Sequence, residues 1–457
     1  MASNRRLLKP SKKTRTKSAE NLSAIVEVSS TINDFDQFNR FDHAIVDEVS
    51  ATVSTFHPSA QGQTHSVLAK RKGYQNPATL AQELRLLQAQ GSMSFGDSEQ
   101  DALSIAQVAK SYGAEILVTS SGGPLANELK KIEAIHAYAD LNRAGPIVNM
   151  VNKKRVKDIC SGFRPNVIAA RSRAPAHAAK AAAHLYKLPF VTYFHAIYDV
   201  KSDKQHRFNG VLASGDRVIV PSQYVYDHVQ KFYGVPSERL SLIPRGVDLY
   251  RFSPTAVNPQ AVMDLRNKLG LVAGRPVFVM SGRLSFWKGH HLFIEAIKGM
   301  SETNPYGLIF TYGDQEKDYA QDLEKLLKRW KMGDRIKIIH EPQDMPTVYG
   351  LADAVVSTSI EPEGFIRSIA EAMCLGKACI AANHGSAPEQ ILHHETGWLF
   401  PPGDVGALVT CLKEAISLDE EPRANLAAWS MEAARTKHDL AKVCDEEIDI
   451  FLQLLNG

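Results

Sequence analysis

The residues with the clearest chemical potential are two glutamates and a glycine in the run EPEGFIRSIAEAM. Glu363 and Gly364 stand near its start, and Glu371 follows with seven residues between the two glutamates. A glycine where a helix begins lets a phosphate approach backbone N–H groups at the positive end of the helix dipole. Carboxylates repel phosphate but accept hydrogen bonds from sugar or ribose hydroxyls. The run therefore predicts a ligand with both phosphate and hydroxyl groups.

A second segment, GRLSFWKG, supplies positive charge. Gly282 and Arg283 follow an apolar run, and Lys288 precedes a helical pattern. A diphosphate needs about two balancing cations, which an arginine and a lysine can supply without a metal ion. His195 is a third candidate, because it directly follows the apolar run FVTYF. Each of these three candidates could also have a purely structural role. The glutamates could lie on a solvated helix face, the two cations could form a surface ion pair, and the histidine could be a core residue that is hydrogen-bonded to the backbone.

The elements that must position these residues alternate between strand and helix. Short apolar runs separated by helical patterns indicate parallel sheets covered on both faces. One series of expected strands comprises residues 84–89, 115–119, 166–170, 189–194 and 217–220, and a second comprises residues 276–282, 308–313, 335–340, 354–359 and 378–383. After the first strand, Ser98 and Asp101 predict a capping box at the start of a helix.

This order predicts an α/β chain with two Rossmann-like, doubly wound domains. Ligands of open α/β sheets bind beyond the carboxyl ends of the strands, so a cleft between the two domains is the expected site. We expect the domains over residues 81–248 and 249–432. A partly disordered extension over residues 1–80 precedes them, and a helix over residues 433–457 follows and packs on the first domain.

Together these segments resemble the retaining glycosyltransferases of the GT-B fold, glycosyltransferase family 4. Four segments in family order carry the resemblance: LIPRGVDLYRF, GRLSFWKG, EPEGFIRSIAEAM and GSAPEQILHHETGWLFPPGD. Some positions depart from the pattern, since Arg245 stands where an asparagine is usual, and Ala196 and Ser386 replace glycines. Ile366 also replaces a glycine, and its side chain could narrow the access of the donor to the backbone.

The resemblance implies a role for each candidate. Arg283 and Lys288 would bind the donor diphosphate and stabilise it as it leaves. Glu363 would hold donor-sugar hydroxyls, Glu371 the ribose hydroxyls, and His195 would contact the transferred sugar. The implied catalytic residues are His195, Arg283, Lys288 and Glu363; the implied donor-binding residues are Gly96, Gly282, Arg283, Lys288, Glu363, Gly364, Phe365, Ile366 and Glu371.

The implied activity is transfer of a hexose from a nucleotide-diphosphate sugar, with retention of configuration and without a cofactor or metal ion. The pair Asp34 and Asp36 precedes every expected strand, so we interpret this Asp-x-Asp as coincidence. The segment from Ser172 to Asp199 is similar to bacterial members that build lipopolysaccharide or other surface glycans. Arg171 and Arg173 could then face an anionic glycan or lipid-linked acceptor, or pair with carboxylates at the surface.

Two other functions stay open. A nucleotide-sugar epimerase of the same fold would lack the two spaced glutamates, which counts against it. A catalytically degenerate member that acts as a nucleotide-sugar-binding or scaffold protein has Ile366 as its support.

Charge and cysteine content indicate partners and compartment. The net charge is +3, but residues 1–20 alone carry +6, which leaves −3 for residues 21–457. This balance argues against nucleic acid as a partner. The basic tail could bind an anionic membrane surface, be a solvated tail, or be a targeting presequence. Five cysteines without metal-type spacing favour a reducing cytoplasm, and a lipid-linked acceptor would place the protein at the inner face of the membrane.

Overall fold

The computed structural model describes residues 81–142, 146–198, 202–312, 316–340 and 344–456. The expected extension over residues 1–80, with its basic tail and the pair Asp34 and Asp36, lies outside these ranges.

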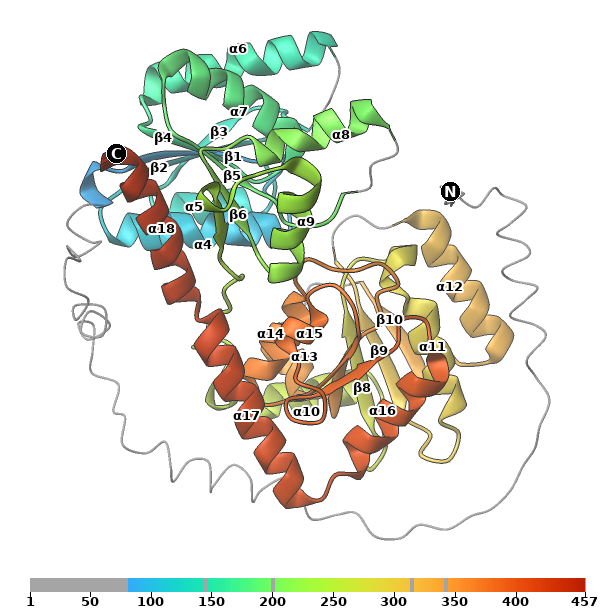
Figure 1. Cartoon of the computed structure of the whole chain (residues 1–457). Coiled ribbons are helices and arrows are strands. Elements are labelled where there is room, and N and C mark those ends of the chain that lie inside the picture. Colours follow the sequence, from blue (N-terminus) through green and yellow to red (C-terminus); the bar gives the residue numbers. More distant parts are fainter. Residues whose placement is uncertain (1–80, 143–145, 199–201, 313–315, 341–343, 457) are drawn as a thin grey trace, which may run out of the picture. The chain divides into compact units, whose positions relative to one another are not determined.

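The first sheet has seven parallel strands (Figure 1). They are β1 (Arg85–Ala89), β2 (Glu115–Ser120), β3 (Ile135–Tyr138), β4 (Val167–Ala170), β5 (Phe190–Tyr193), β6 (Arg217–Val220) and β7 (Leu240–Leu242). Their order is β3-β2-β1-β4-β5-β6-β7, so the direction of winding reverses between β1 and β4. The loops after these two strands flank the topological switch point, where ligands of such sheets bind.

The second sheet has six parallel strands in the order β10-β9-β8-β11-β12-β13. They are β8 (Val277–Ser281), β9 (Tyr306–Phe310), β10 (Ile336–Ile339), β11 (Ala354–Ser357), β12 (Ala378–Ala382) and β13 (Trp398–Phe400). Its switch point lies between β8 and β11, which are hydrogen-bonded neighbours. The expectation of two Rossmann-like sheets is therefore confirmed.

Helices cover both faces of each sheet. Those around the first are α4 (Asp97–Ser111), α5 (Leu125–Lys131), α6 (Pro146–Phe163), α7 (Arg173–Tyr186), α8 (Asp203–Asn209) and α9 (Gln223–Tyr233). Those around the second are α10 (Pro259–Lys268), α11 (His290–Gly299), α12 (Lys317–Trp330), α13 (Met345–Gly350), α14 (Arg367–Cys374), α15 (Ala387–Gln390) and α16 (Val405–Ser417). Successive strand residues point to opposite faces, so Leu86 and Leu87 belong to two different buried clusters. Burial of both faces explains why inner strands such as β4, β8 and β11 are apolar runs.

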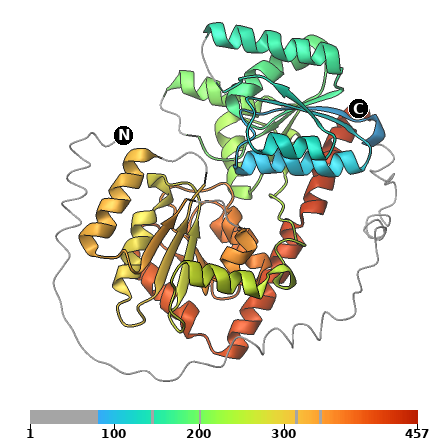
Figure 2. The ribbon, with the colours of Figure 1, turned by 180° about the vertical axis from the view of Figure 1, so that it is seen from behind.

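Two C-terminal helices complete the chain (Figure 2). α17 (Glu420–His438) packs against α14, whereas α18 (Leu440–Asn456) packs against α4 of the first sheet. Val443, Cys444 and Ile448 of α18 join the cluster that contains Leu86. No helix within the described ranges is long and apolar enough to cross a bilayer.

The capping box predicted at the start of α4 is wrong. The helix begins at Asp97, its N-cap is Gly96, and no side chain caps it. Ser98 lies inside the first turn, where its hydroxyl receives a 3.2 Å hydrogen bond from Gln90. Asp101 is turned toward an arginine of α14 instead of the N-cap backbone.

Candidate active site

The loops after β8 and β11 bring the predicted donor residues together at the switch point of the second sheet. The Lys288 ammonium lies 2.6 Å from a carboxylate oxygen of Glu363. Only 17% of the Lys288 side chain and 9% of the Glu363 side chain are exposed. Lys288 is therefore not part of a surface ion pair, the structural role that the sequence left open. The other Glu363 oxygen accepts a hydrogen bond from the Ser359 hydroxyl.

Glycines allow these two loops to meet. Gly289 has a φ of +72°, and a Cβ there would come closer than 3.0 Å to the carbonyl oxygen of Thr358. The loop after β8 can therefore lie directly on the loop after β11. Arg283 is exposed on the first of these loops, and its guanidinium makes no ion pair or hydrogen bond with another described residue.

The loop that carries Glu363 also touches the first sheet. A Cβ on Gly364 would come closer than 3.0 Å to the carbonyl oxygen of His195, which follows β5. Phe365 and Ile366 are 7% and 5% exposed and belong to a core cluster of the second sheet. The Ile366 amide donates a 3.0 Å hydrogen bond to Gln390, so this backbone group already has a partner.

Glu371 lies further along α14 and is held by the hydroxyl group of Tyr349. Tyr349 donates a 3.1 Å hydrogen bond to its carboxylate and also contacts the Ser281 hydroxyl at 3.0 Å. Burial raises the pKa of Glu371 to about 7, and the negative charge of Asp97 acts in the same direction, against Arg367. Glu371 is therefore partly protonated near neutral pH.

His195 faces a small cavity of about 20 Å³, which Arg171 and Arg245 also line. This volume has room for a water molecule. Its ring stacks on Tyr193 with 5.6 Å between the centroids, and its Nε2 is buried with no hydrogen-bond partner in the described part of the chain. Burial, followed by the charges of Arg245 and Arg171, holds the pKa of His195 well below its usual range, so the imidazole is neutral.

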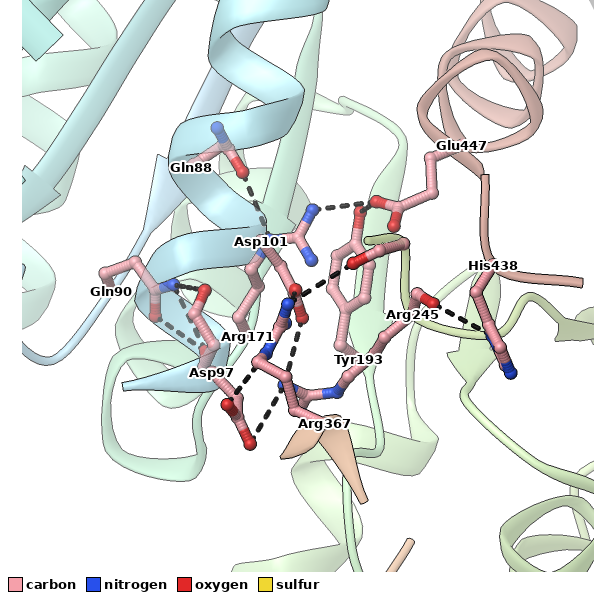
Figure 3. A network of polar contacts seen from close by, with 12 residues as sticks. Gln88, Gln90, Asp97, Asp101, Arg171, Tyr193, Arg245, Arg367, His438 and Glu447 are labelled. Atoms are coloured by element: carbon pink, nitrogen blue, oxygen red, sulfur yellow. Dashed lines mark hydrogen bonds and ion pairs between the residues drawn. The ribbon is translucent and has the colours of Figure 1, made fainter. Parts of the chain in front are cut away.

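A network of charges joins α4 to α14 beside these residues (Figure 3). Arg367 donates to Asp97 through Nε at 2.8 Å and to Asp101 through Nη2 at 2.6 Å. The Arg245 guanidinium lies 3.2 Å from Asp101 and 3.6 Å from Asp97. The contact of Arg245 is ionic without hydrogen-bond geometry, since its Nε and Nη1 have no hydrogen-bond partner among the described residues. Gly96, the first-domain candidate, is the N-cap directly before Asp97.

Arg367 and Asp97 were not predicted as site residues from the sequence. A signal was present, because acids at Asp97 and Asp101 are one helical turn apart and face the same side of α4. Their partner, however, lies 266–270 residues away along the chain.

The surface position allowed for Arg171 is wrong. Its side chain is 1% exposed, lies 2.7 Å from Glu447 of α18 and stacks 3.7 Å above the Tyr193 ring. Arg173 donates a 3.0 Å hydrogen bond to Asn209 and lies 4.2 Å above the Tyr198 ring. Neither arginine forms an ion pair with a surface carboxylate of the described chain.

Metal-ligating side chains do not cluster in the described ranges: no group of three or more His, Cys, Asp or Glu residues there could hold a metal ion. All five cysteines are buried and free.

Solved structures match the fold. A glycosyltransferase from Rickettsia africae superimposes with a TM-score of 0.74 and 25% identity, covering 81% of this chain and 98% of that one. Anabaena HepE, solved in complex with UDP and glucose, has a TM-score of 0.70 and 24% identity, covering 81% and 99%.

Curated relatives match over shorter stretches. The D-inositol 3-phosphate glycosyltransferase of Xylanimonas cellulosilytica is 27% identical over 56% of this chain and 64% of its own length. The putative colanic acid biosynthesis glycosyltransferase WcaL of Escherichia coli is 26% identical over 58% of this chain and 64% of its own length. The chain thus spans less than two thirds of these relatives.

Two family models cover most of both sheets. "Glycosyltransferase Family 4" matches residues 102–251, and "Glycosyl transferases group 1" matches residues 263–429. With the fold and the order of segments, these matches confirm the resemblance: the chain belongs to the family 4 glycosyltransferases of the GT-B fold.

Proposed function

We propose that this protein is a retaining hexosyltransferase that moves a sugar from a nucleotide-diphosphate donor to a glycan or lipid-linked glycan acceptor. One observation carries the proposal: the loop after β8 carries both Lys288, which forms an ion pair with Glu363, and Arg283, which is exposed and has no partner among the described residues. This arrangement supplies cations for a diphosphate and a carboxylate for hydroxyls in one place.

In this proposal, donor binding changes the ionic partner of Lys288. A diphosphate oxygen takes the Lys288 ammonium from Glu363, and Arg283 supplies the second cation. Glu363, still held by Ser359, then accepts hydrogen bonds from donor-sugar hydroxyls. Glu371, on α14, accepts hydrogen bonds from the ribose. The resemblance to HepE, whose solved forms include one with UDP-glucose, supports a nucleotide-sugar donor.

Sugar transfer then needs charge stabilisation more than a protein nucleophile. The acceptor hydroxyl attacks from the face that the diphosphate leaves, and the leaving phosphate takes the acceptor proton. Arg283 and Lys288 stabilise the negative charge that develops on the leaving group. Neutral His195, whose Nε2 has no partner among the described residues, can form a hydrogen bond with the transferred sugar. Because two cations serve the diphosphate, the proposal includes neither metal ion nor cofactor.

The acceptor side of the proposal is assigned to residues 81–248 and the donor side to residues 249–432. The relative WcaL, named for colanic acid biosynthesis, supports an acceptor in surface-polysaccharide or lipopolysaccharide synthesis. A lipid-linked acceptor would place the protein at the inner face of the membrane, with residues 1–20 drawn to anionic lipid.

A thermal-shift screen tests the proposal. UDP, GDP and their sugars are added to the purified protein, and stabilisation follows from mass action. We expect a nucleoside diphosphate to raise the Tm more than its nucleoside does. Measuring the release of nucleoside diphosphate from the donor separates the alternatives. An epimerase would interconvert the sugar without releasing nucleoside diphosphate, and a scaffold would bind the donor without turnover. Absence of any shift with either diphosphate would contradict the proposal.

A further inference from the structure

Arg367 is placed where a cation is electrostatically unfavourable. It is the first residue of α14, and the first turn of a helix carries partial positive charge, which favours acids over bases. Arg367 also lies between Glu363 and Glu371 in the sequence, at the end of the loop that forms the candidate donor site. An anion close to this point is needed to offset both the side-chain charge and the helix dipole.

Two carboxylates of another helix provide that anion in this structure. Asp97 and Asp101 of α4 accept hydrogen bonds of 2.8 and 2.6 Å from the Arg367 guanidinium (Figure 3). The third nitrogen of the guanidinium donates to the Gly246 carbonyl oxygen at 3.3 Å. The two carboxylates differ in access, because 39% of the Asp97 side chain is exposed and only 12% of the Asp101 side chain. Asp97 is therefore the partner that a ligand from solvent could replace.

The Arg367–Asp97 pair belongs to the same electrostatic neighbourhood as the donor residues. Although burial opposes it, the charges of Arg367, Arg245 and Lys288 together hold the pKa of Asp97 below its usual range. Burial raises the pKa of nearby Tyr312, and the charges of Asp97, Glu371 and Glu363 raise it further.

The charges of the described residues at this site are almost balanced. Lys288 is paired with Glu363, and the guanidinium groups of Arg245 and Arg367 are paired with Asp97 and Asp101. Within the described part of this site, Arg283 alone is an unpaired cation. A nucleoside diphosphate brings at least two negative charges, so Arg283 does not suffice unless other cations exchange their partners.

We propose that Arg367 is a ligand of the donor diphosphate and that Asp97 is its placeholder. A bound diphosphate takes the position of Asp97 on the guanidinium, while Asp101 and Gly246 keep the side chain oriented. The negative charge that offsets Arg367 at the start of α14 is then supplied by the ligand. This inference rests on the proposed nucleotide-sugar donor and adds a third cation and a competing carboxylate to its site.

Isothermal titration calorimetry with UDP, GDP and the matching nucleosides tests the assignment. Arg367→Gln should weaken nucleoside diphosphate binding by about 10- to 100-fold, the effect of losing one charge-assisted hydrogen bond, and leave nucleoside binding nearly unchanged. Asp97→Asn should tighten diphosphate binding by about fivefold, because it removes a competing charge. In the double variant Arg367→Gln/Asp97→Asn, the gain in affinity from Asp97→Asn should vanish, because the Arg367 guanidinium for which Asp97 competes is absent.

Matched controls come from α6, where Arg155 and Asp158 are exposed. Arg155→Gln and Asp158→Asn should bind both ligand classes as the wild type does. If the wild type binds diphosphate and Arg367→Gln binds it equally well, or Asp97→Asn shows no gain, the assignment is overturned and the proposed function stands. If Arg367→Gln weakens diphosphate and nucleoside binding equally, the residue has a general structural role and the assignment is also overturned. If the wild type binds neither diphosphate, both proposals fail.

Discussion

The backbones of Gly364 and His195 are in direct contact: a Cβ on Gly364 would come closer than 3.0 Å to the His195 carbonyl oxygen. Gly364 follows Glu363 in the loop after β11, and His195 follows β5 of the other sheet. The residues that the two sheets would contribute to sugar transfer are therefore held in register by an approach that only glycine permits.

Gly364→Ala should consequently damage both stability and turnover. The added methyl group meets a backbone oxygen that cannot rotate away and also reaches the Val225 side chain. We expect a loss of about 1–3 kcal/mol in the free energy of unfolding, measured with urea. Gly162→Ala in α6 is the control, because a Cβ there meets no atom within 4 Å. Wild-type stability and turnover in Gly364→Ala would show that the contact is not constraining.

Glu371→Gln should change how stability depends on pH. The Glu371 pKa is raised from 4.5 to about 7, chiefly by burial. Between these values the folded state binds more protons than the unfolded state, so this residue lowers stability as pH rises through the window. Glutamine keeps an acceptor for the Tyr349 hydroxyl but cannot ionise. The variant should therefore gain roughly 2 kcal/mol relative to wild type between pH 5 and pH 8.

Urea unfolding of both proteins at several pH values measures this difference. Other titrating groups, such as the buried His438, are common to both proteins and largely cancel in the comparison. Parallel pH profiles for the two proteins would mean that Glu371 has an ordinary pKa.

Much of the fold could be predicted because a buried parallel strand is a continuous apolar run. The strands β4, β8 and β11 are of this kind, and they include the strands on both sides of the second switch point. Three strands were not predicted. β3 (Ile135–Tyr138) is an edge strand with exposed ends, and β7 and β13 have only three residues each.

Single residues of the site could be predicted from the sequence, but the ion pairs between them could not. Glycines and charges after strands marked Arg283, Lys288 and Glu363, because parallel strands end at the same edge of a sheet. The partner of each charge depends on how the two sheets and α18 pack. For that reason neither the Arg171–Glu447 pair, 276 residues apart, nor the Arg367–Asp97 pair left a local signal.

Chelation should leave activity nearly unchanged. In the proposed mechanism Arg283 and Lys288 balance the diphosphate, so no divalent ion has a necessary role. Donor turnover measured with and without EDTA should agree within about twofold, an effect of under 0.5 kcal/mol on the barrier. Complete loss that Mg²⁺ or Mn²⁺ restores would show that the charge balance of the site has been misjudged.

Deletion of residues 1–20 tests the membrane part of the proposal. Seven basic residues in this segment would be drawn to anionic lipid, at about 1 kcal/mol for each residue near the surface. The full chain should sediment with anionic vesicles at low salt, bind less at high salt, and lose this binding on deletion. Equal binding by both proteins would refute tethering through the tail.

The most direct test of the account is the release of nucleoside diphosphate from UDP- and GDP-sugars, followed by ³¹P NMR, for wild type and Lys288→Ala. The wild type should release diphosphate from at least one donor, and Lys288→Ala should lower kcat by about 10²–10³. Lys288→Ala leaves Glu363 without its cation, which could destabilise the fold. Urea unfolding of this variant, and of the double variant Lys288→Ala/Glu363→Gln, therefore serves to separate a loss of turnover from a loss of folding. Near wild-type turnover in folded Lys288→Ala, or no release by the wild type from any donor, would contradict the account.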